Sequence, residues 1–80
     1  MTKRQREILS IMAAHRHDDK GELVYERGLA YLGNDRVASR TVFAFLRMMA
    51  ISLEDGEVGV GLERYRINDT GLQLLRARAD

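Results

Sequence analysis

The predicted fold depends most on one stretch of the sequence, residues 28–47, which reads GLAYLGNDRVASRTVFAFLR. In the first part of the stretch, Leu29 and Leu32 are spaced as residues one helical turn apart, and Gly33 can end a helix at its C-terminal cap. The spacing therefore predicts a short helix over residues 26–32.

A longer helix is expected to follow and to end at Ala50. Its apolar face is made by residues at helical spacing, namely Val42, Phe45, Leu46 and Met49. The start of this helix stays open between Arg36 and Arg40. Several residues near that point carry side-chain oxygens that can cap a helix N-terminus: Asn34, Asp35 and Ser39.

Another helix is predicted toward the N-terminus, over residues 2–16. Its apolar positions are Ile8, Ile11, Met12 and His15 on one face, with Leu9 beside them. The segment Leu23–Tyr25 is partly β-branched, which suits a brief strand, although it could equally open the next helix.

After residue 50 the hydrophobic period changes to two. Alternation on both sides of a glycine-rich segment predicts a hairpin over residues 51–67, with a turn signal at Asp55-Gly56 and with Tyr65 and Ile67 on one side of the second strand. With the short strand at 23–25, this hairpin would complete a three-stranded sheet.

A last helix is expected after Asn68 or Asp69, either of which can cap it. Leu72 and Leu75 would face the core, and Leu74 would be exposed about 100° away from them. Two arginines lie near the C-terminal end of this helix, where they would complement its dipole: Arg76 and Arg78.

Length and composition exclude several classes of protein. The 80 residues, 45% hydrophobic and 31% charged, suit a single globular domain over residues 1–80. We expect no membrane span, because no apolar run approaches the roughly 18–20 residues of a span. We expect no secretory signal either, because the charged N-terminus carries no long apolar stretch ahead of a cleavage site. The absence of cysteine excludes disulfides and fits a reducing cytoplasm. Because the formal net charge is only +1, nucleic-acid binding would depend on local clusters of basic residues.

Three segments, GLAYLG (28–33), SRTVFAFLR (39–47) and YRINDTGLQLL (65–75), occur in an order and spacing that resemble the winged helix-turn-helix domains of bacterial and phage transcription regulators. They are similar to the second helix with its glycine turn, the recognition helix and the exit from the wing. The resemblance implies an α+β, mainly helical fold, in the order helix, short strand, helix, helix, two-stranded wing and C-terminal helix.

The resemblance also implies a small transcription regulator that binds double-stranded DNA sequence-specifically. Its recognition helix, at about residues 36–50, would enter the major groove with the wing, 51–67, alongside. The residues expected to contact bases or phosphates from this helix are Ser39, Arg40, Thr41, Ala44 and Arg47. Flanking phosphates could be held by Lys3, Arg4, Arg64 and Arg66.

Two departures from the family pattern weaken this interpretation. The turn between Gly33 and Thr41 is longer than is usual in the family. The wing is also acidic at its base, where phosphate-binding wings usually carry Lys or Arg, and its acidic residues are Glu54, Asp55, Glu57 and Glu63.

The basic residues and the apolar helix also have plainer explanations. Arg64 and Arg66 could pair with acidic residues across the hairpin, and the basic N-terminus could simply be solvated. Phe43 and Met48 make the predicted recognition helix apolar almost all round, which suits a protein contact. The alternative function is therefore a winged-helix protein-interaction module, such as a small inhibitor or adaptor, without DNA binding.

A homodimer is expected, because one domain of this size contacts too few base pairs to be selective in a genome. If the two terminal helices lie side by side, their offset leucines could form one strip that a second copy covers. The residues considered for an interface are Leu9, Phe43, Met48 and Leu74.

No catalytic, metal or cofactor site is predicted. His15 and His17 would lie on different sides of a helix, and no further ligands follow at a recognisable spacing, so His15 is expected to be a partly buried core residue. The glycines of residues 56–61 join two strands, whereas a dinucleotide-binding glycine loop follows a strand and opens a helix. We therefore expect no enzyme.

Overall fold

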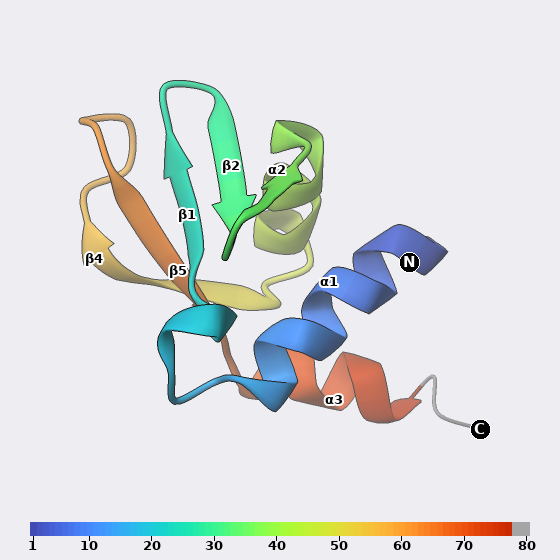
Figure 1. The fold of residues 1–80 in the computed structure, drawn as a ribbon. Coiled ribbons are helices and arrows are strands. Elements are labelled where there is room, and N and C mark those ends of the chain that lie inside the picture. The colour runs from blue at the N-terminus through green and yellow to red at the C-terminus, as the bar shows by residue number, and fades with distance from the viewer. Residues whose placement is uncertain (78–80) are drawn as a thin grey trace.

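Five short antiparallel strands form one sheet in the order β3-β2-β1-β5-β4 (Figure 1). The computed structural model describes residues 1–77, so Arg78 of the last predicted helix lies outside the described residues. The elements in chain order are α1 (Lys3–Ala14), the short 3-10 helix η1 (Asp19–Gly21), β1 (Leu23–Glu26), β2 (Leu29–Leu32), β3 (Asp35–Val37), α2 (Ser39–Arg47), β4 (Ile51–Gly56), β5 (Glu63–Ile67) and α3 (Asp69–Ala77).

The helix predicted over residues 26–32 is wrong, because these residues belong to two successive hairpins. Arg27 and Gly28 connect β1 to β2 with φ angles of 52° and 82°, and positive φ at both central residues is what a type I′ turn requires. Gly33, with φ of 62°, and Asn34 connect β2 to β3 in a second tight turn. Gly33 therefore reverses a strand and does not cap a helix.

The side chains of β2 alternate between the two faces of the sheet. Ala30 and Leu32 are buried, whereas Leu29 and Tyr31 are exposed. Leu29 and Leu32 would share one face of a helix, but in this strand they lie on opposite faces. A helix between these two tight turns would have too few residues to be stable. Pairing with β1 and β3 instead satisfies the backbone N–H and C=O groups of residues 29–32.

These hairpins overturn the predicted fold class. Among residues 1–77, only the short η1 separates α1 from α2 as a helical element, and the strand expected at 23–25 belongs to a sheet of five strands, where three were expected. The winged helix-turn-helix arrangement is therefore wrong. The chain is a small α+β domain with three α-helices and a five-stranded antiparallel sheet.

The hairpin predicted over residues 51–67 is present, but it forms one side of the larger sheet. β4 and β5 pair from Ile51↔Ile67 to Gly56↔Glu63, so β4 runs through the turn expected at Asp55-Gly56. The register shifts between Leu53 and Asp55, as in a β-bulge. β5 also pairs with β1, which a free-standing wing would not do.

Helix α2 begins at Ser39, between the two starts considered from the sequence, and Ala38 is its N-cap residue without a side-chain cap. Asn34 and Asp35 belong to the β2–β3 hairpin and do not cap it. Its buried residues are Thr41, Val42 and Phe45. The predicted apolar face is therefore rotated, because Leu46 and Met49 are exposed.

Helices α1 and α3 are capped by side chains that the sequence offers. Thr2 and Gln5 form a capping box, in which each side chain accepts a hydrogen bond from the other residue's backbone N–H. Asn68 Oδ1 accepts from the Gly71 N–H at 2.9 Å, as predicted for the last helix. On α1 the buried residues are Ile8, Leu9 and Met12, whereas Ile11, which was expected to face inward, is exposed.

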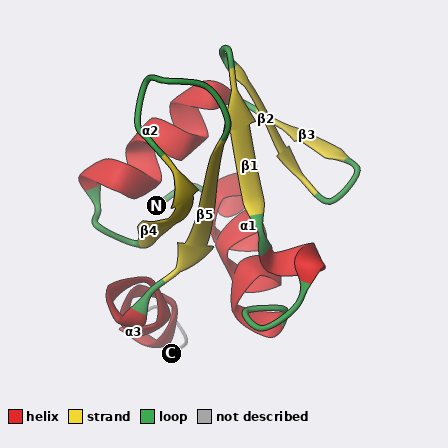
Figure 2. Cartoon of the chain, turned by 90° about the vertical axis from the view of Figure 1, so that its left-hand side faces the viewer, coloured by secondary structure: helices red, strands yellow, loops and turns green. Residues whose placement is uncertain are grey.

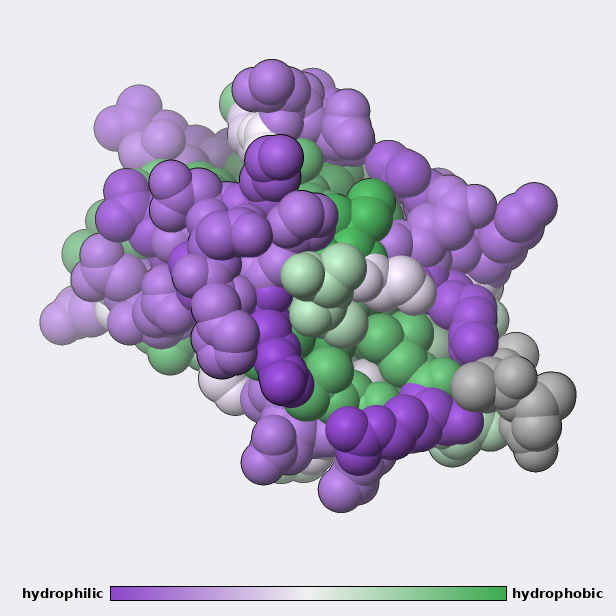
Figure 3. Space-filling model, turned by 60° about the horizontal axis from the view of Figure 1, so that its bottom comes forward, coloured by the Kyte–Doolittle hydropathy of each residue, from purple (hydrophilic) through white to green (hydrophobic). Residues whose placement is uncertain are grey.

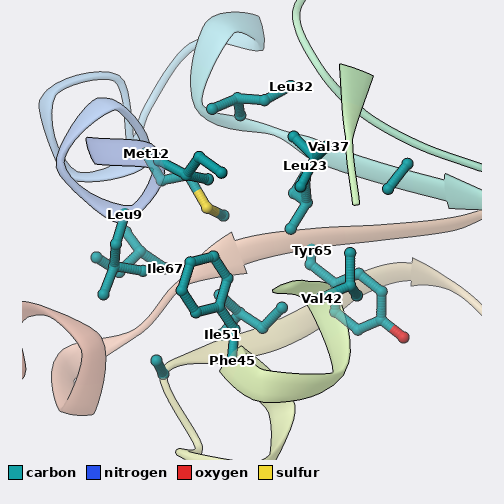
Figure 4. Packing of buried hydrophobic residues seen from close by; sticks show 13 residues of the cluster. Leu9, Met12, Leu23, Leu32, Val37, Val42, Phe45, Ile51, Tyr65 and Ile67 are labelled. Atoms are coloured by element: carbon teal, nitrogen blue, oxygen red, sulfur yellow. The ribbon is translucent and has the colours of Figure 1, made fainter. Parts of the chain in front are cut away.

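The hydrophobic core lies between the sheet and the helices that pack on it (Figure 4). α1 and α2 lie on one face of the sheet, and α3 packs beside α1 at one end (Figures 1 and 2). The buried apolar residues are Ile8, Leu9, Met12, Leu23, Ala30, Leu32, Val37, Val42, Phe45, Ala50, Ile51, Tyr65 and Ile67. Within residues 1–77, every helix is too short or too polar to cross a membrane.

Candidate nucleic-acid interface

A hollow of about 340 Å³ lies between the N-terminal half of α1 and helix α2. We call it the basic groove, because three of its lining residues are arginines. It is lined by Thr2, Arg4, Gln5 and Ile8 from α1 and by Ala38, Arg40, Thr41, Ala44 and Arg47 from α2 and its N-cap. It thus brings together five of the nine residues that the sequence predicts for DNA contact.

Helix geometry determines which side chains of α2 border the groove. Arg40 and Arg47 are seven residues apart, about two helical turns, so both lie on the same exposed side of the helix. Ser39 and Ala44 are half-buried beside them. Thr41 is only 7% exposed and forms part of the wall of the groove, and its predicted contact with bases stays a prediction.

The first turn of α1 supplies the opposite side of the groove. The capping box of Thr2 and Gln5 holds this turn in place, and Lys3 and Arg4 are exposed on it. Arg4 has one long ion pair, with Glu7 at 3.8 Å, and more than half of each side chain is exposed. Such an exposed pair contributes little energy and leaves the guanidinium available to a stronger anionic partner.

The positive charge around the groove is largely uncompensated. Among residues 1–77, Lys3, Arg40 and Arg47 have no carboxylate within ion-pairing distance. The three arginines that line the groove therefore have one ion-pair partner among the described residues, Glu7, which pairs with Arg4, although the net charge of the whole chain is only +1. An anion with several charges would be attracted to this side of the molecule.

Arg64 and Arg66 do not reach the basic groove. They lie on the outer face of the sheet, where Arg64 pairs with Asp55 at 3.2 Å and with Glu22 at 3.6 Å. Arg66 pairs with Glu54 at 2.7 Å and donates a hydrogen bond to the Asp18 carbonyl oxygen at 2.7 Å. The cross-strand pairing considered as the alternative is therefore present, and the contact of Arg64 and Arg66 with phosphates stays a prediction.

Comparisons with known proteins do not assign this chain to a family. No family model, curated protein sequence or solved structure matches it. The candidate interface is defined by its own side chains, namely the exposed arginines of two neighbouring helices, of which Arg40 and Arg47 have no acidic partner among the described residues and Arg4 has one exposed partner, Glu7.

The histidine and aspartate residues after α1 form a local contact. His15 Nδ1 lies 3.0 Å from Asp18 Oδ2, and this hydrogen bond is the main cause that lowers the pKa of the Asp18 carboxyl group. His15 is half-buried. Within residues 1–77, no three His, Asp or Glu side chains gather closely enough to hold a metal ion.

One buried polar cluster was missed from the sequence. Glu63, which was counted among the acidic residues at the base of the wing, is only 4% exposed. Its carboxylate accepts hydrogen bonds from the Gly59 N–H at 2.8 Å and from the Tyr65 hydroxyl. The alternation of β5 could have revealed this burial. Glu63 lies two residues before Tyr65 and four before Ile67, so all three side chains face the same side of the sheet.

The buried cluster predicts how stability changes at alkaline pH. Burial, followed by the hydrogen bond and the charge of Glu63, raises the pKa of Tyr65 above its ordinary value of 10.0. Above pH 10 the unfolded chain ionises Tyr65 while the folded chain keeps the proton. The contribution of protonated Tyr65 to the free energy of unfolding is therefore fully present below pH 10 and is lost as the pH rises further.

Ultraviolet absorbance of tyrosinate, followed together with circular dichroism, tests this expectation. One of the three tyrosines should ionise only as the protein unfolds, and Tyr65→Phe should remove that coupled transition. Ionisation of all three tyrosines in a fully folded protein would contradict it.

Leu9 does not form part of an exposed apolar strip between the terminal helices. Leu9 is 0% exposed, and Leu74 and Met48 are partly buried against the core. A view of the lower face of the molecule shows a continuous hydrophobic area beside the residues drawn in grey and smaller hydrophobic areas toward the opposite edge (Figure 3). Of the four predicted interface residues only Phe43 is exposed, at 44%, with its ring edge-on to that of Tyr25 at 5.7 Å.

Proposed function

We propose that this chain binds double-stranded DNA through the basic groove, as a small transcription regulator of the cytoplasm without enzymatic activity. Helix α2 would lie in the major groove, with Arg40 and Arg47 toward bases, and Lys3 and Arg4 would contact neighbouring phosphates. The observation that carries the proposal is the convergence of three exposed arginines, from two helices, on one hollow with little acidic compensation.

The dimensions of α2 support this mode of binding. Nine residues make a helix about 13.5 Å long, and the major groove, about 12 Å wide, admits a single helix. The planar guanidinium groups of Arg40 and Arg47 can each pair in a bidentate way with guanine. No wing takes part in this proposal, because the acidic hairpin would be repelled by phosphate.

Replacing Arg40 or Arg47 by alanine should lower the affinity for a selected duplex by about 1–3 kcal/mol, which is roughly five- to 150-fold in Kd. The target duplex comes from selection out of random sequences, and fluorescence polarisation gives the affinity. Lys3→Ala should weaken binding to all duplexes equally and reduce the salt dependence, because it removes a phosphate contact.

Arg76→Ala is the matched control, since it removes the same charge from an exposed residue of α3 that does not line the basic groove. It should change Kd less than about twofold. A selection that enriches no sequence, or equal losses for Arg40→Ala and Arg76→Ala, would remove sequence-specific DNA binding from consideration.

A protein-interaction module is the second candidate function, and the exposure of Phe43 and its apolar neighbours favours it. Salt dependence separates the two candidates, because DNA affinity falls steeply as salt rises. A folded protein that binds no duplex even at low salt would favour the interaction module.

A further inference from the structure

The side chain of Thr41 is buried, yet its hydroxyl has no partner inside the described part of the chain. Thr41 is 7% exposed and lines the basic groove. Among residues 1–77 its hydroxyl makes no hydrogen bond, whereas the polar groups of buried residues are normally paired. The hydroxyl oxygen is not fully enclosed, so a molecule in the groove can reach it. This hydroxyl is therefore available to an acceptor from outside the chain.

The uncapped start of α2 lies at the same place. The first N–H groups of an α-helix have no partner within the helix. The N-cap residue Ala38 has no side chain that could accept from them, and its carbonyl oxygen accepts only from the Thr41 N–H, at 2.9 Å, among the first three residues of α2. The N–H groups of Ser39 and Arg40 remain, and together with the helix dipole they favour an anion. Helix α1, by contrast, begins with a capping box.

The charge around this point selects the chemical class of the anion. Arg40 lines the groove from the first turn of α2, and Arg4 lines it from α1. Within the described residues Arg40 has no ion pair, and the one partner of Arg4 is the exposed Glu7. A hydroxyl, backbone N–H groups and a guanidinium group together offer more donors than the two oxygens of a carboxylate can use. A phosphate group has more acceptor oxygens and is the anion that such donors commonly bind.

We propose that the start of α2 is a phosphate-binding site, in which one phosphate group accepts hydrogen bonds from the Thr41 hydroxyl and from the backbone N–H groups of Ser39 and Arg40. The guanidinium group of Arg4 supplies positive charge from the other side of the groove, and the Arg40 side chain stays available to a base. Where the phosphate belongs to a DNA backbone, this inference rests on the proposed function, and the contact fixes the position of α2 on the duplex. A small phosphorylated molecule carries the same chemistry.

Thr41→Val tests the hydroxyl, because valine keeps the branched shape of threonine and removes the donor. The hydroxyl has no partner among the described residues, so the Tm of the variant should equal or exceed that of the wild type. Its affinity for inorganic phosphate, measured from amide chemical shifts at constant ionic strength, should fall at least about tenfold. Thr41→Ser keeps the hydroxyl and should retain most of the affinity. A Thr41→Val chain that binds phosphate as tightly as the wild type would overturn the site.

The same titration locates the bound phosphate. The amide signals of Ser39 and Arg40 should shift and saturate as inorganic phosphate is added, and Arg4→Ala should weaken the binding. Arg76→Ala, which removes the same charge from an exposed residue outside the groove, should leave the affinity unchanged. Shifts that never saturate, or equal losses for Arg4→Ala and Arg76→Ala, would show nonspecific attraction of anions and would refute the site.

Duplex measurements separate this site from the proposed function. In the selected duplex, an uncharged methylphosphonate at the contacted phosphate should weaken binding of the wild type but not of Thr41→Val. A chain that binds inorganic phosphate and adenosine monophosphate through Thr41, but binds no duplex, refutes the proposed function and leaves the site standing with a small phosphorylated ligand. A duplex that the wild type and Thr41→Val bind equally well refutes the site and leaves the proposed function standing.

Discussion

Replacing Gly71 by alanine is expected to lower the free energy of unfolding by about 2–3 kcal/mol, even though alanine is the better helix former by about 1 kcal/mol. Gly71 is buried in the first turn of α3, and a Cβ atom there would collide with the Ala50 carbonyl oxygen and lie 2.6 Å from Ile67 Cγ1. Neither neighbour can easily move. The Ala50 oxygen accepts a hydrogen bond from the Asn68 N–H at 3.1 Å, and Ile67 is paired with Ile51.

Chemical denaturation measures this loss, and Gly61→Ala is its matched control. A Cβ atom at Gly61 would meet nothing within 4 Å, so that substitution should change the stability by less than about 0.5 kcal/mol. Equal stabilities for the two variants would show that α3 does not pack this closely against the start of β4.

Removing the buried carboxylate of Glu63 is expected to cost about 2–4 kcal/mol, since Glu63→Ala leaves two donors without an acceptor and opens a cavity. The donors are the Gly59 N–H, which holds the loop over residues 57–62, and the hydroxyl of Tyr65. Glu63 is 4% exposed, so its carboxylate is largely removed from solvent in the folded chain and depends on these two donors.

Glu57→Ala provides the comparison for this prediction. Glu57 carries the same charge in the same loop, but its side chain is exposed and makes no hydrogen bond to the described residues, so we expect a change below about 0.5 kcal/mol. A double-mutant cycle of Glu63→Ala with Tyr65→Phe should give a coupling energy of about 0.5–3 kcal/mol. Additive losses would indicate that the two side chains act independently.

The candidate site was predicted in part. Arg40 and Arg47 could be assigned to one exposed side of a helix because their separation is close to two full turns. The approach of Arg4 to them could not be predicted, since it depends on how α1 packs against α2. Arg64 and Arg66 carry the same charge and lie on one face of β5, as the alternation predicts. Acidic neighbours from β4 and from the segment before β1 pair with them there, which the sequence pattern of β5 alone does not reveal.

By itself the sequence determined the elements whose local signals agree: a helix beginning near Thr2, a helix ending before Ala50, a hairpin over residues 51–67 and a last helix capped by Asn68. Local signals suffice there, because the first and last helices carry their own capping residues and the alternation on both sides of residues 56–61 favours a hairpin. Only the tertiary structure decided residues 26–32, where Leu29, Leu32 and Gly33 suit a helix as well as a strand. Strand pairing with β1 and β3 and the burial of Ala30 and Leu32 select the strand, because a helix of this length could not satisfy its own backbone hydrogen bonds.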